Sequence, residues 1–572
     1  MTTAEVDFQS LRFDATRHAD QRAATSARHP VIVVGAGPVG LALAIDLAQR
    51  GTRVVLLDND NTLSTGSRAI CFAKRTLEIF DRLGCGQRMV DKGVSWQVGK
   101  VFFRDEQIYQ FDLLAEPGHA RPAFINLQQY YVEGYLAQRA AELPLIDLRW
   151  KHKVIGLQQL ADHAVLTIET PDGRYELLAD HVVACDGSRS MLRELAGVKS
   201  EGRVFRDRFL IADVKMTIDQ PAERWFWFDP AFHRAQSVQG QKSTPSSVLM
   251  HMQPDSVWRI DFQLGWDADP EVEKRPENII PRVEALLANS AMRDVPFKLE
   301  WASVYTFACT RMPGFRVGRV LFAGDAAHGV SPFGARGANS GVQDADNLGW
   351  KLALVVQGRA SDALLDTYAQ EREYAADENI LNSTRATDFI TPKSEISLLF
   401  RNAVLDLARR HPFARTLVNS GRLSVPATLD GSALNTPDAA PFQGRMRPGA
   451  AAADAPVTRA DGTASWLLRE LGDGFTVLVG GRPSPASAAL RRAAEGLVAL
   501  KVLHVLTTGE AAAAPFDDDS IVIDRAGLVA QRYDLAPATA CLLRPDQHVC
   551  ARWREPSPDA LRAAMRRALA LT

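Results

Sequence analysis

The chain is 572 residues long, enough for two to four domains with sizeable cores, and its hydrophobic content of 46% and charged content of 23% are ordinary for a globular protein. Its formal net charge is −2 and no run of basic residues stands out, so nucleic-acid or anionic-membrane binding is not indicated. The six cysteines form no C-x-x-C pair, and the first 27 residues lack an export signal's apolar core. We therefore expect a cytoplasmic protein without a metal site, and no stretch is apolar enough to cross a membrane.

Residues 30–58 predict a unit that binds a dinucleotide. Residues 31–34 resemble a buried parallel strand, a turn with the spacing G-x-G-x-x-G follows, and a helix ends near Gly51 before a second apolar strand at 54–57. In such a turn Gly35 permits the sharp bend, Gly37 lets a pyrophosphate approach the backbone, and Gly40 lets helix and strand pack closely. The motif alone would also fit a packing turn in any α/β domain. The order of strand, turn, helix, strand and acid favours dinucleotide binding.

The N-terminus of the predicted helix is the expected phosphate site, because its N–H groups and dipole favour negative charge. Asp58 follows the second strand and is expected to accept a hydrogen bond from a ribose hydroxyl. The candidate contacts in this unit are Gly35, Gly37, Pro38, Val39, Gly40, Asp58 and Asn59.

Short helices and strands are expected to follow, after an N-terminal extension (1–27) that is either loosely ordered or clasps a partner. The expected elements are a loop and helix at 67–84, strands within 98–113, a helix at 127–142 and a hairpin at 166–178. The apolar run 181–185 then stops at Asp186 and Gly187.

Between residues 208 and 265 the hydrophobic period changes to two, which predicts an inserted antiparallel sheet with one covered face. The expected strands are 208–218, 223–229, 247–253 and 257–265, followed by a helix at 277–289. In the last strand Trp258, Ile260 and Phe262 share one face, opposite Arg259 and Asp261.

The chain then returns to a buried strand at 319–323, which runs into Gly324 and Asp325. A glycine-broken loop (331–341) opens a helix with an apolar stripe, and a charged helix follows at about 361–386. Residues 420–465 are dense in Ala, Gly, Pro and Asp and predict a linker or irregular wrap. Strands at 475–479, 502–506, 521–523 and 539–543 and a final helix predict a separate small α/β domain.

The opening motif, the Asp186-Gly187 turn and the Gly324–Gly341 block, in this order, strongly resemble the FAD-dependent aromatic hydroxylases, the single-component flavoprotein monooxygenases. The resemblance covers most of residues 28–400 and is nearest to the branch of 3-(3-hydroxyphenyl)propionate hydroxylase and phenol hydroxylase. It implies an α/β fold: a discontinuous Rossmann-like FAD-binding domain with an inserted antiparallel β-sheet substrate domain, and a C-terminal thioredoxin-like domain.

The implied domains are an extension (1–27), an FAD-binding part (28–205, with a substrate region near 98–125), a substrate sheet (206–300), a second FAD-binding part (301–400), a helical segment and linker (401–465) and the thioredoxin-like domain (466–572). Cys541 and Cys550 do not have the spacing of a redox pair, so that last domain is expected to be structural or to form a homodimer.

The resemblance also implies roles at the FAD. Gly35, Gly37 and Gly40 would hold the pyrophosphate, Asp58 the adenosine ribose, and Asp325 the ribityl hydroxyls. The other implied contacts are Arg68, Gln129 (or Gln128), Asp186, Gly187, Gly324, Pro332, Gly337, Ala338 and Asn339. The N–H groups that open the helix after Gly337 are suited to the negative charge of reduced flavin.

The inserted sheet is expected to form an apolar cover over the flavin. Candidate walls are Trp225, Trp227, His251, Trp258, Arg259 and Phe262. The alternative for any one of them is that the tryptophans are core and Arg259 is a solvated strand residue. His328 is expected to be a hydrogen-bonded structural residue rather than a base, and no catalytic base is predicted. Arg336 is expected either to be a charged loop residue or to steer a pyridine nucleotide.

As the family works, NADH or NADPH reduces FAD, O₂ forms a C4a-hydroperoxide, and one oxygen passes to a phenolic ring. The chain has no second nucleotide unit, which fits transient NAD(P)H docking. Two alternatives remain. A flavin-dependent halogenase has a W-x-W-x-I-P signature, which residues 225–228 half-match before Asp229 and Pro230 depart from it. The other alternative is a non-catalytic flavin-binding scaffold.

Overall fold

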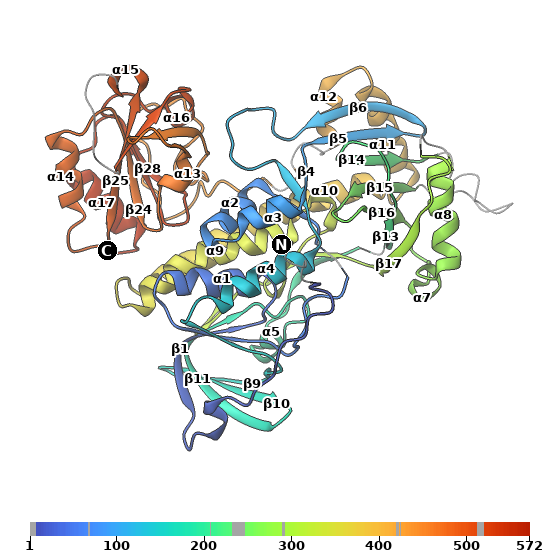
Figure 1. Cartoon of the computed structure of the whole chain (residues 1–572), viewed down its shortest axis with the longest axis horizontal. Coiled ribbons are helices and arrows are strands. Elements are labelled where there is room, and N and C mark those ends of the chain that lie inside the picture. Colours follow the sequence, from blue (N-terminus) through green and yellow to red (C-terminus); the bar gives the residue numbers. More distant parts are fainter. Residues whose placement is uncertain are drawn as a thin grey trace, which may run out of the picture.

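The computed structural model describes residues 7–66, 69–205, 207–230, 246–288, 292–418, 423, 425–511 and 520–571. A central α/β part carries a β-sheet part on one side and the C-terminal α/β part on the other (Figure 1).

The central sheet is built on the strand that precedes the glycine turn. β1 (Ala27–Val34) pairs in parallel with β2 (Val54–Leu57) and with β11 (Gly173–Ala184). The sheet order is β19 (Arg316–Val317), β20 (Val320–Phe322), β11, β1, β2 and β8 (Ile146–Arg149). The buried strands expected at 31–34, 54–57 and 319–323 are therefore confirmed, and all lie in one sheet.

β11 is one strand that contains two segments expected separately, the second half of the hairpin at 166–178 and the apolar run 181–185. Its outer half forms the predicted hairpin with β10 (Ala164–Thr170), and its last four residues are buried on both faces. The hydrophobic alternation becomes a continuous apolar run where helices cover both faces, so one strand carries both patterns.

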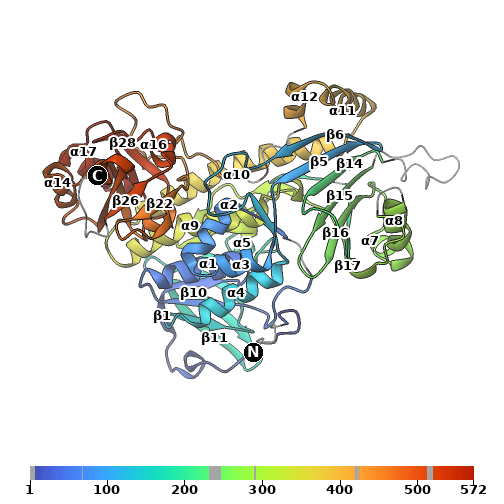
Figure 2. The ribbon, with the colours of Figure 1, turned by 45° about the horizontal axis from the view of Figure 1, so that its top comes forward.

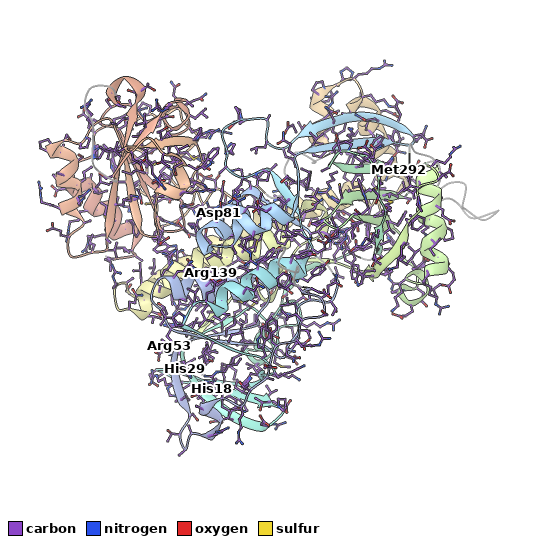
Figure 3. The ribbon with its side chains drawn as sticks, viewed as in Figure 1. His18, His29, Arg53, Asp81, Arg139 and Met292 are labelled. Carbon is purple, nitrogen blue, oxygen red and sulfur yellow. The ribbon has the colours of Figure 1, made fainter. Side chains whose placement is uncertain are left out.

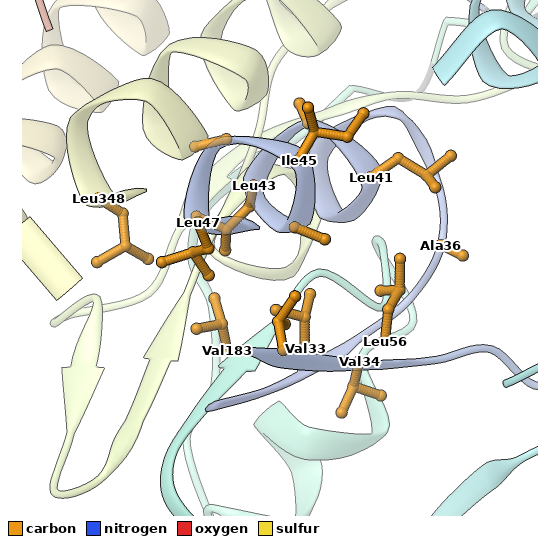
Figure 4. Packing of buried hydrophobic residues seen from close by; sticks show 14 of the residues in the cluster. Val33, Val34, Ala36, Leu41, Leu43, Ile45, Leu47, Leu56, Val183 and Leu348 are labelled. Carbon is orange, nitrogen blue, oxygen red and sulfur yellow. The ribbon is translucent and has the colours of Figure 1, made fainter. Parts of the chain in front are cut away.

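α1 (Pro38–Gln49) packs its apolar side on this sheet and against α9 (Gly337–Val356). Leu41, Leu43, Ile45 and Leu47 are fully buried, and the close-up shows them above Val33 with Leu348 of α9 beside them (Figure 4). The helix gives way to a left-handed glycine, Gly51, as expected.

The second sheet contains the strands expected between residues 208 and 265. Its order is β17 (Lys298–Tyr305), β13 (Phe209–Lys215), β16 (Val257–Gln263), β15 (Ser247–Met252), β14 (Arg224–Phe228), β5 (Val98–Phe103) and β6 (Glu106–Asp112). It is mixed rather than purely antiparallel, because β14 pairs in parallel with β5. The expectation of an antiparallel sheet is corrected there: the hairpin β5–β6 comes from an earlier crossing of the chain and joins the inserted strands side by side.

α8 (Pro276–Ala288) lies along the outer face of this sheet, away from the central part (Figure 2). α10 (Ala363–Ile390), α11 (Glu395–Ala408) and α12 (Pro412–Leu417) follow α9 in the chain, and α10 packs against α9.

The described residues of the N-terminal extension lie against the central part. Phe8 packs edge-on against Tyr131 and Tyr135 of α4 (Gln129–Ala141), and Phe13 stacks on Trp150 at 4.4 Å between ring centroids. Residues 7–26 are therefore held by this chain itself. Figure 3 marks the neighbouring α4 by Arg139, whose Nε donates to the Leu83 carbonyl oxygen of α2 (Lys74–Leu83) at 3.0 Å.

The C-terminal sheet has the order β23 (Ala464–Trp466), β22 (Pro456–Arg459), β26 (Ile521–Asp524), β25 (Leu500–Thr507), β24 (Phe475–Gly480), β27 (Ala540–Leu543) and β28 (Val549–Trp553). β22 and β23 precede residue 466, so this sheet begins inside the segment expected to be a linker. Cys541 and Cys550 are buried and free. No helix among the described residues is long and apolar enough to cross a membrane.

Candidate functional site

The turn between β1 and α1 uses its glycines in two different ways. Gly35 has φ +105°, and a Cβ there would lie 2.4 Å from the Cys185 carbonyl oxygen; a Cβ on Gly40 would lie 1.9 Å from the carbonyl oxygen of Gly35. Both positions therefore require glycine for packing. Gly37, the N-cap of α1, has an ordinary φ of −76°, and a Cβ there would meet nothing within 4 Å. Its missing side chain leaves open space in front of a helix N-terminus, which is what an approaching phosphate needs.

Segments far apart in the sequence meet at this turn. A Cβ on Gly341, in the first turns of α9, would lie 2.7 Å from Cγ2 of Val39 and 3.1 Å from Cα of Gly324. Cys185 N donates to the Val34 carbonyl oxygen, so the loop with Asp186 and Gly187 leaves the sheet next to the glycine turn. The carboxyl ends of β1, β11 and β20 thus bring the three predicted motifs together, at the edge where α/β sheets bind ligands.

Three carboxylates lie along this edge and differ in burial and in hydrogen bonding. Asp58 accepts from Ala36 N at 2.6 Å and Asp60 N at 2.8 Å, and burial raises its pKa. Asp186 accepts from Leu192 N at 3.0 Å, while its Oδ1 is buried without a hydrogen-bond partner, and burial raises its pKa as well. Asp325 is exposed between buried neighbours. Asp58 fixes the glycine turn in addition to any role with a ribose.

The start of α9 is tied to the strand β3 (Cys71–Ala73). Asn339 accepts from Ala73 N at 2.8 Å and donates from Nδ2 to the Cys71 carbonyl oxygen at 2.8 Å. Its side chain is therefore occupied by the protein, so only its backbone remains for a ligand. A Cβ on Gly337 would come no nearer than 3.7 Å to other atoms, which keeps the first turn of α9 thin, and Pro332 opens the loop before it.

His328 belongs to a buried network that connects the Gly324 turn to α9 and α10. Its Nε2 lies 2.7 Å from Oδ2 of Asp344, which also accepts from Gly324 N at 2.9 Å, and Oδ1 of Asp344 accepts from Arg372 Nε at 2.6 Å. Burial alone would raise the pKa of Asp344, but the charges of His328 and Arg372 bring it below its ordinary value. This is the structural role expected for His328. Asp344 was not predicted, because its only signal in the sequence is an acidic residue within an apolar stripe.

The remaining predicted FAD contacts lie near these loops or outside the described residues. Gln129 accepts from Ala69 N at 3.2 Å and donates to Ser64 Oγ at 3.0 Å, whereas Gln128 donates to the Pro254 carbonyl oxygen. Gln129 thus adjoins the loop that follows Arg68, and Arg68 itself lies outside the described residues. Arg336 is buried and donates to Asn379 Oδ1 at 2.8 Å, so it is not a solvated loop residue.

Four of the residues predicted to line the substrate site point toward α8. Trp227, Trp258 and Phe262 are buried in a cluster with Ile279 and Val283 of α8, and Trp225 packs against the same cluster. These aromatic side chains form the core between the sheet and α8, because strand alternation places the largest apolar residues on the face that a helix covers. The prediction that they line a substrate site is corrected accordingly.

The opposite face carries a row of polar residues across four strands: Arg224, His251, Arg259 and Asp213 are successive cross-strand partners on β14, β15, β16 and β13. Arg259 is buried and donates from Nε and Nη2 to the two carboxylate oxygens of Asp213, at 2.8 Å each, so it is not a solvated strand residue. Burial and the neighbouring arginines hold the pKa of His251 well below its usual range. Of the predicted walls, only His251 and Arg259 lie on this face.

This polar face contacts loops at the carboxyl ends of β1, β11 and β20, an edge of the central sheet that we call the glycine edge. Nη2 of Arg224 donates to the Phe333 carbonyl oxygen at 3.2 Å, in the loop that begins with Pro332, and Asn126 on β7 (Phe124–Asn126) donates to the Met252 carbonyl oxygen at 2.7 Å. Arg224, Asp213, Asp261 and Tyr305 were missed in the sequence because alternate polar residues in a strand usually face solvent.

The FAD binding domain family matches residues 28–383 of this sequence. The chain belongs to this family. A curated relative, a flavin-dependent monooxygenase of Mycobacteroides abscessus, is 33% identical over 60% of this chain and 70% of its own length. A 3-(3-hydroxy-phenyl)propionate/3-hydroxycinnamic acid hydroxylase of Mycobacterium sp. (strain JLS) is 31% identical over 72% of this chain and 68% of its own length.

Among solved structures, the flavin-dependent monooxygenase PieE in complex with FAD and substrate covers 96% of this chain and 100% of its own, with a TM-score of 0.78 at 22% identity. That likeness concerns the fold. The family and the curated relatives confirm the resemblance to FAD-dependent aromatic hydroxylases, so the chain is an FAD-dependent monooxygenase and the halogenase alternative is not favoured. Within the described residues, no group of three or more His, Cys, Asp or Glu is placed to hold a metal ion.

Proposed function

We propose that this monooxygenase hydroxylates a small phenolic substrate, with NADH or NADPH as transient reductant and O₂ as co-substrate. The observation that carries the proposal is the meeting of the glycine edge of the central sheet with a buried polar face of the second sheet. The link is the contact between Arg224 and the Phe333 carbonyl oxygen.

The residues present fit FAD. The open space at Gly37 and the N–H groups that begin α1 suit the pyrophosphate. Asp58 would accept from the adenosine ribose and Asp325 from the ribityl hydroxyls. The other proposed contacts are Pro38, Val39, Asn59, Arg68, Gln129, Asp186, Gly187, Gly324, Pro332, Gly337, Ala338 and the backbone of Asn339. FAD, when bound, supplies the activation of O₂ and the transfer of one oxygen atom.

This chain's own contribution is positioning, charge and exclusion of water. The N–H groups at the start of α9 face the region expected for the flavin ring and favour negative charge there. The polar face of the second sheet is buried at Arg224, His251 and Arg259, which keeps bulk water from it, as a reactive oxygen intermediate requires.

A screen of phenols with the purified flavoprotein tests the proposal. Hydroxybenzoates, hydroxyphenylpropionates and resorcinols are added in turn, NAD(P)H oxidation is followed, and the product is identified by mass. We expect at least one phenol to stimulate oxidation and to gain one oxygen atom. Protein that carries full flavin but is stimulated by none of these phenols would contradict the proposed substrate class.

We further propose that the chain is a homodimer in the cytoplasm and that residues 466–572 form a thioredoxin-like domain. The order β25, β24, β27, β28, with β25 parallel and β27 antiparallel to β24, supports the second point. For the dimer, large apolar side chains are exposed on α11 and α12, among them Ile396, Leu399 and Phe413 at 80%, 71% and 64%. These helices therefore compete with residues 466–572 as the interface.

A further inference from the structure

Two charged groups on the polar face of the second sheet form no ion pair among the described residues. Asp261 is the first. It lies two residues beyond Arg259 on the same face of β16, and its Oδ1 is buried without a hydrogen-bond partner. No ion pair to it exists among the described residues either. The carboxyl group lies deep in the protein, while the residue as a whole keeps some accessible surface.

Arg224 is the second. The side chain is buried, its Nη1 has no hydrogen-bond partner, and Nη2 reaches only the neutral Phe333 carbonyl oxygen. Arg259 differs, because Asp213 neutralises it. Burying polar atoms without hydrogen-bond partners is costly, so the unsatisfied Arg224 Nη1 and Asp261 Oδ1 on one face indicate a missing polar ligand.

The two groups are placed to hold one substrate oxygen between them. Arg224 is on β14 and Asp261 on β16, with β15 between them, and adjacent strands lie about 4.8 Å apart. The guanidinium group of Arg224 and the carboxyl group of Asp261 lie near enough that the charge of each shifts the pKa of the other. Arg224 also touches the loop proposed to line the flavin ring, so an oxygen held here belongs to a ring next to the flavin.

Resting on the proposed function, we propose that Asp261 is the catalytic base that takes the proton of the substrate phenol and that Arg224 binds the resulting phenolate oxygen. The phenol O–H bond breaks, its electron pair stays on the oxygen, and the proton forms a carboxylic acid on Asp261. The charge of the buried group does not change, because the negative charge moves from Asp261 to the substrate while Arg224, Arg259 and Asp213 keep theirs.

The acidity of the groups fits this exchange. Burial is the main cause that raises the pKa of Asp261, to about 7. An ordinary phenol resembles tyrosine, with a pKa of about 10, and a cation beside it lowers that value by roughly one to three. Arg224 thus brings the phenol close to the acidity of Asp261. The other titratable or charged groups facing Asp261 are Arg259, Asp213, His251, Tyr305 and Cys71.

The test uses 4-nitrophenol, whose phenolate is coloured, with the FAD-loaded full chain. In the wild type we expect bound 4-nitrophenol to ionise at a lower pH than in solution. Just above pH 7, where Asp261 is ionised before binding, no proton should be released to the medium as the phenol ionises, because Asp261 takes it. In Asp261→Asn about one proton per phenol that ionises on binding should appear in the medium. In Arg224→Met the bound ligand should ionise at a pH higher by at least about one, whereas Arg224→Lys should restore part of the shift.

Turnover gives a second readout with the phenol found in the screen. Asp261→Asn should hydroxylate about a hundredfold more slowly at neutral pH and recover as the pH approaches the pKa of the free phenol, because phenolate then enters from solution. Arg224→Met should not recover. Asp219→Asn, an exposed carboxylate of the same sheet region, is the matched control, and flavin content and thermal midpoint confirm that each variant is folded.

The outcomes separate the two proposals. Wild-type protein that binds 4-nitrophenol only as the neutral phenol, or not at all, overturns the assignment of Asp261 and Arg224. So does an Asp261→Asn variant with the wild-type pH profile, even if the wild type hydroxylates phenols. If bound 4-nitrophenol ionises as expected while no phenol is hydroxylated, the proposed function fails and the proton-accepting site stands.

Discussion

Single atoms decide what each residue of the glycine turn does. Gly35 and Gly40 are fixed by backbone oxygens at 2.4 and 1.9 Å from the Cβ positions, whereas Gly37 has nothing within 4 Å. The spacing of the motif therefore combines two requirements, packing and access, that a sequence cannot separate. The open space in front of Gly37 is the observation that supports our proposal of a phosphate there.

Gly37→Ala should therefore lose FAD affinity, whereas Gly40→Ala should lose stability. Gly37→Ala has room and an ordinary φ, so we expect the protein to fold with an unchanged thermal midpoint when stripped of flavin, but to bind FAD at least about tenfold more weakly. Gly40→Ala should be destabilised or insoluble, because its Cβ would overlap the Gly35 carbonyl oxygen. Flavin titration and thermal unfolding measure the two effects. Equal FAD affinity in Gly37→Ala would show that no phosphate lies there.

Asp325→Ala should weaken FAD binding without unfolding the protein. The side chain is exposed, and a hydrogen bond from a hydroxyl to a charged acceptor contributes about 1.5–3 kcal/mol, or roughly 10- to 150-fold in affinity. Flavin absorbance per protein after dialysis measures the loss, with Asp172→Asn in an exposed hairpin turn as control. A variant isolated with full flavin content would count against the assignment.

At the scale of elements, the alternation of residues predicts the strands of the second sheet but not which side of the sheet each face covers. The strands at 208–265 and the shared face of Trp258, Ile260 and Phe262 were predictable, because period two is a local property. Which face of the sheet packs on α8 and which contacts the loop of Phe333 is a property of the assembled molecule. The sequence therefore located the aromatic residues but not the buried polar face opposite, and the order of the three motifs predicted the glycine edge because parallel strands all end there.

The network of Asp344 should hold the Gly324 turn to α9. Asp344→Ala leaves Arg372 buried and unpaired, at a cost of about 3–5 kcal/mol. Because the folded protein lowers the pKa of Asp344, the stability it contributes is present above an unfolded pKa of about 3.9 and is lost as the pH falls below it. Thermal unfolding at several pH values measures both, with Asp172→Asn as control. A wild-type midpoint would contradict the structural role.

At the scale of the whole molecule, buried charges join the C-terminal part to the FAD-binding part. Arg544 Nη1 donates to Glu371 Oε1 at 2.5 Å, and Glu371 Oε2 accepts from Lys351 Nζ at 2.7 Å. Trp350 of α9 packs edge-on against Phe475 of β24 at 5.8 Å. The separate domain was predictable from its strands, but this contact was not, because its members lie more than a hundred residues apart.

Glu371→Gln should loosen this junction. It leaves Lys351 and Arg544 short of a buried counter-charge, which costs about 3–5 kcal/mol. Burial opposes the ionised form, but the charges of Arg544 and Lys351 lower the pKa of Glu371 well below its usual range. Its contribution is therefore present above an unfolded pKa of about 4.3 and lost in acid. We expect a lower thermal midpoint and earlier cleavage by protease; unchanged values in both would contradict the argument.

Light scattering distinguishes the two candidate dimer surfaces. Ile396→Ser with Leu399→Ser removes apolar area from α11, and a chain ending before residue 456 removes the whole C-terminal sheet. We expect one of these changes to give a monomer with retained flavin. A wild type that is already monomeric would overturn the homodimer proposal.

The ionic junction has a consequence for the covalent chain. Residues 425–455 connect the two parts, and Ser432 of this connector donates to Glu371 Oε1, but the ion pairs of Glu371 with Lys351 and Arg544 join residues outside the connector. Proteolytic cleavage within this connector would therefore leave two fragments that co-elute in size-exclusion chromatography. We expect these fragments to dissociate only in acid or denaturant.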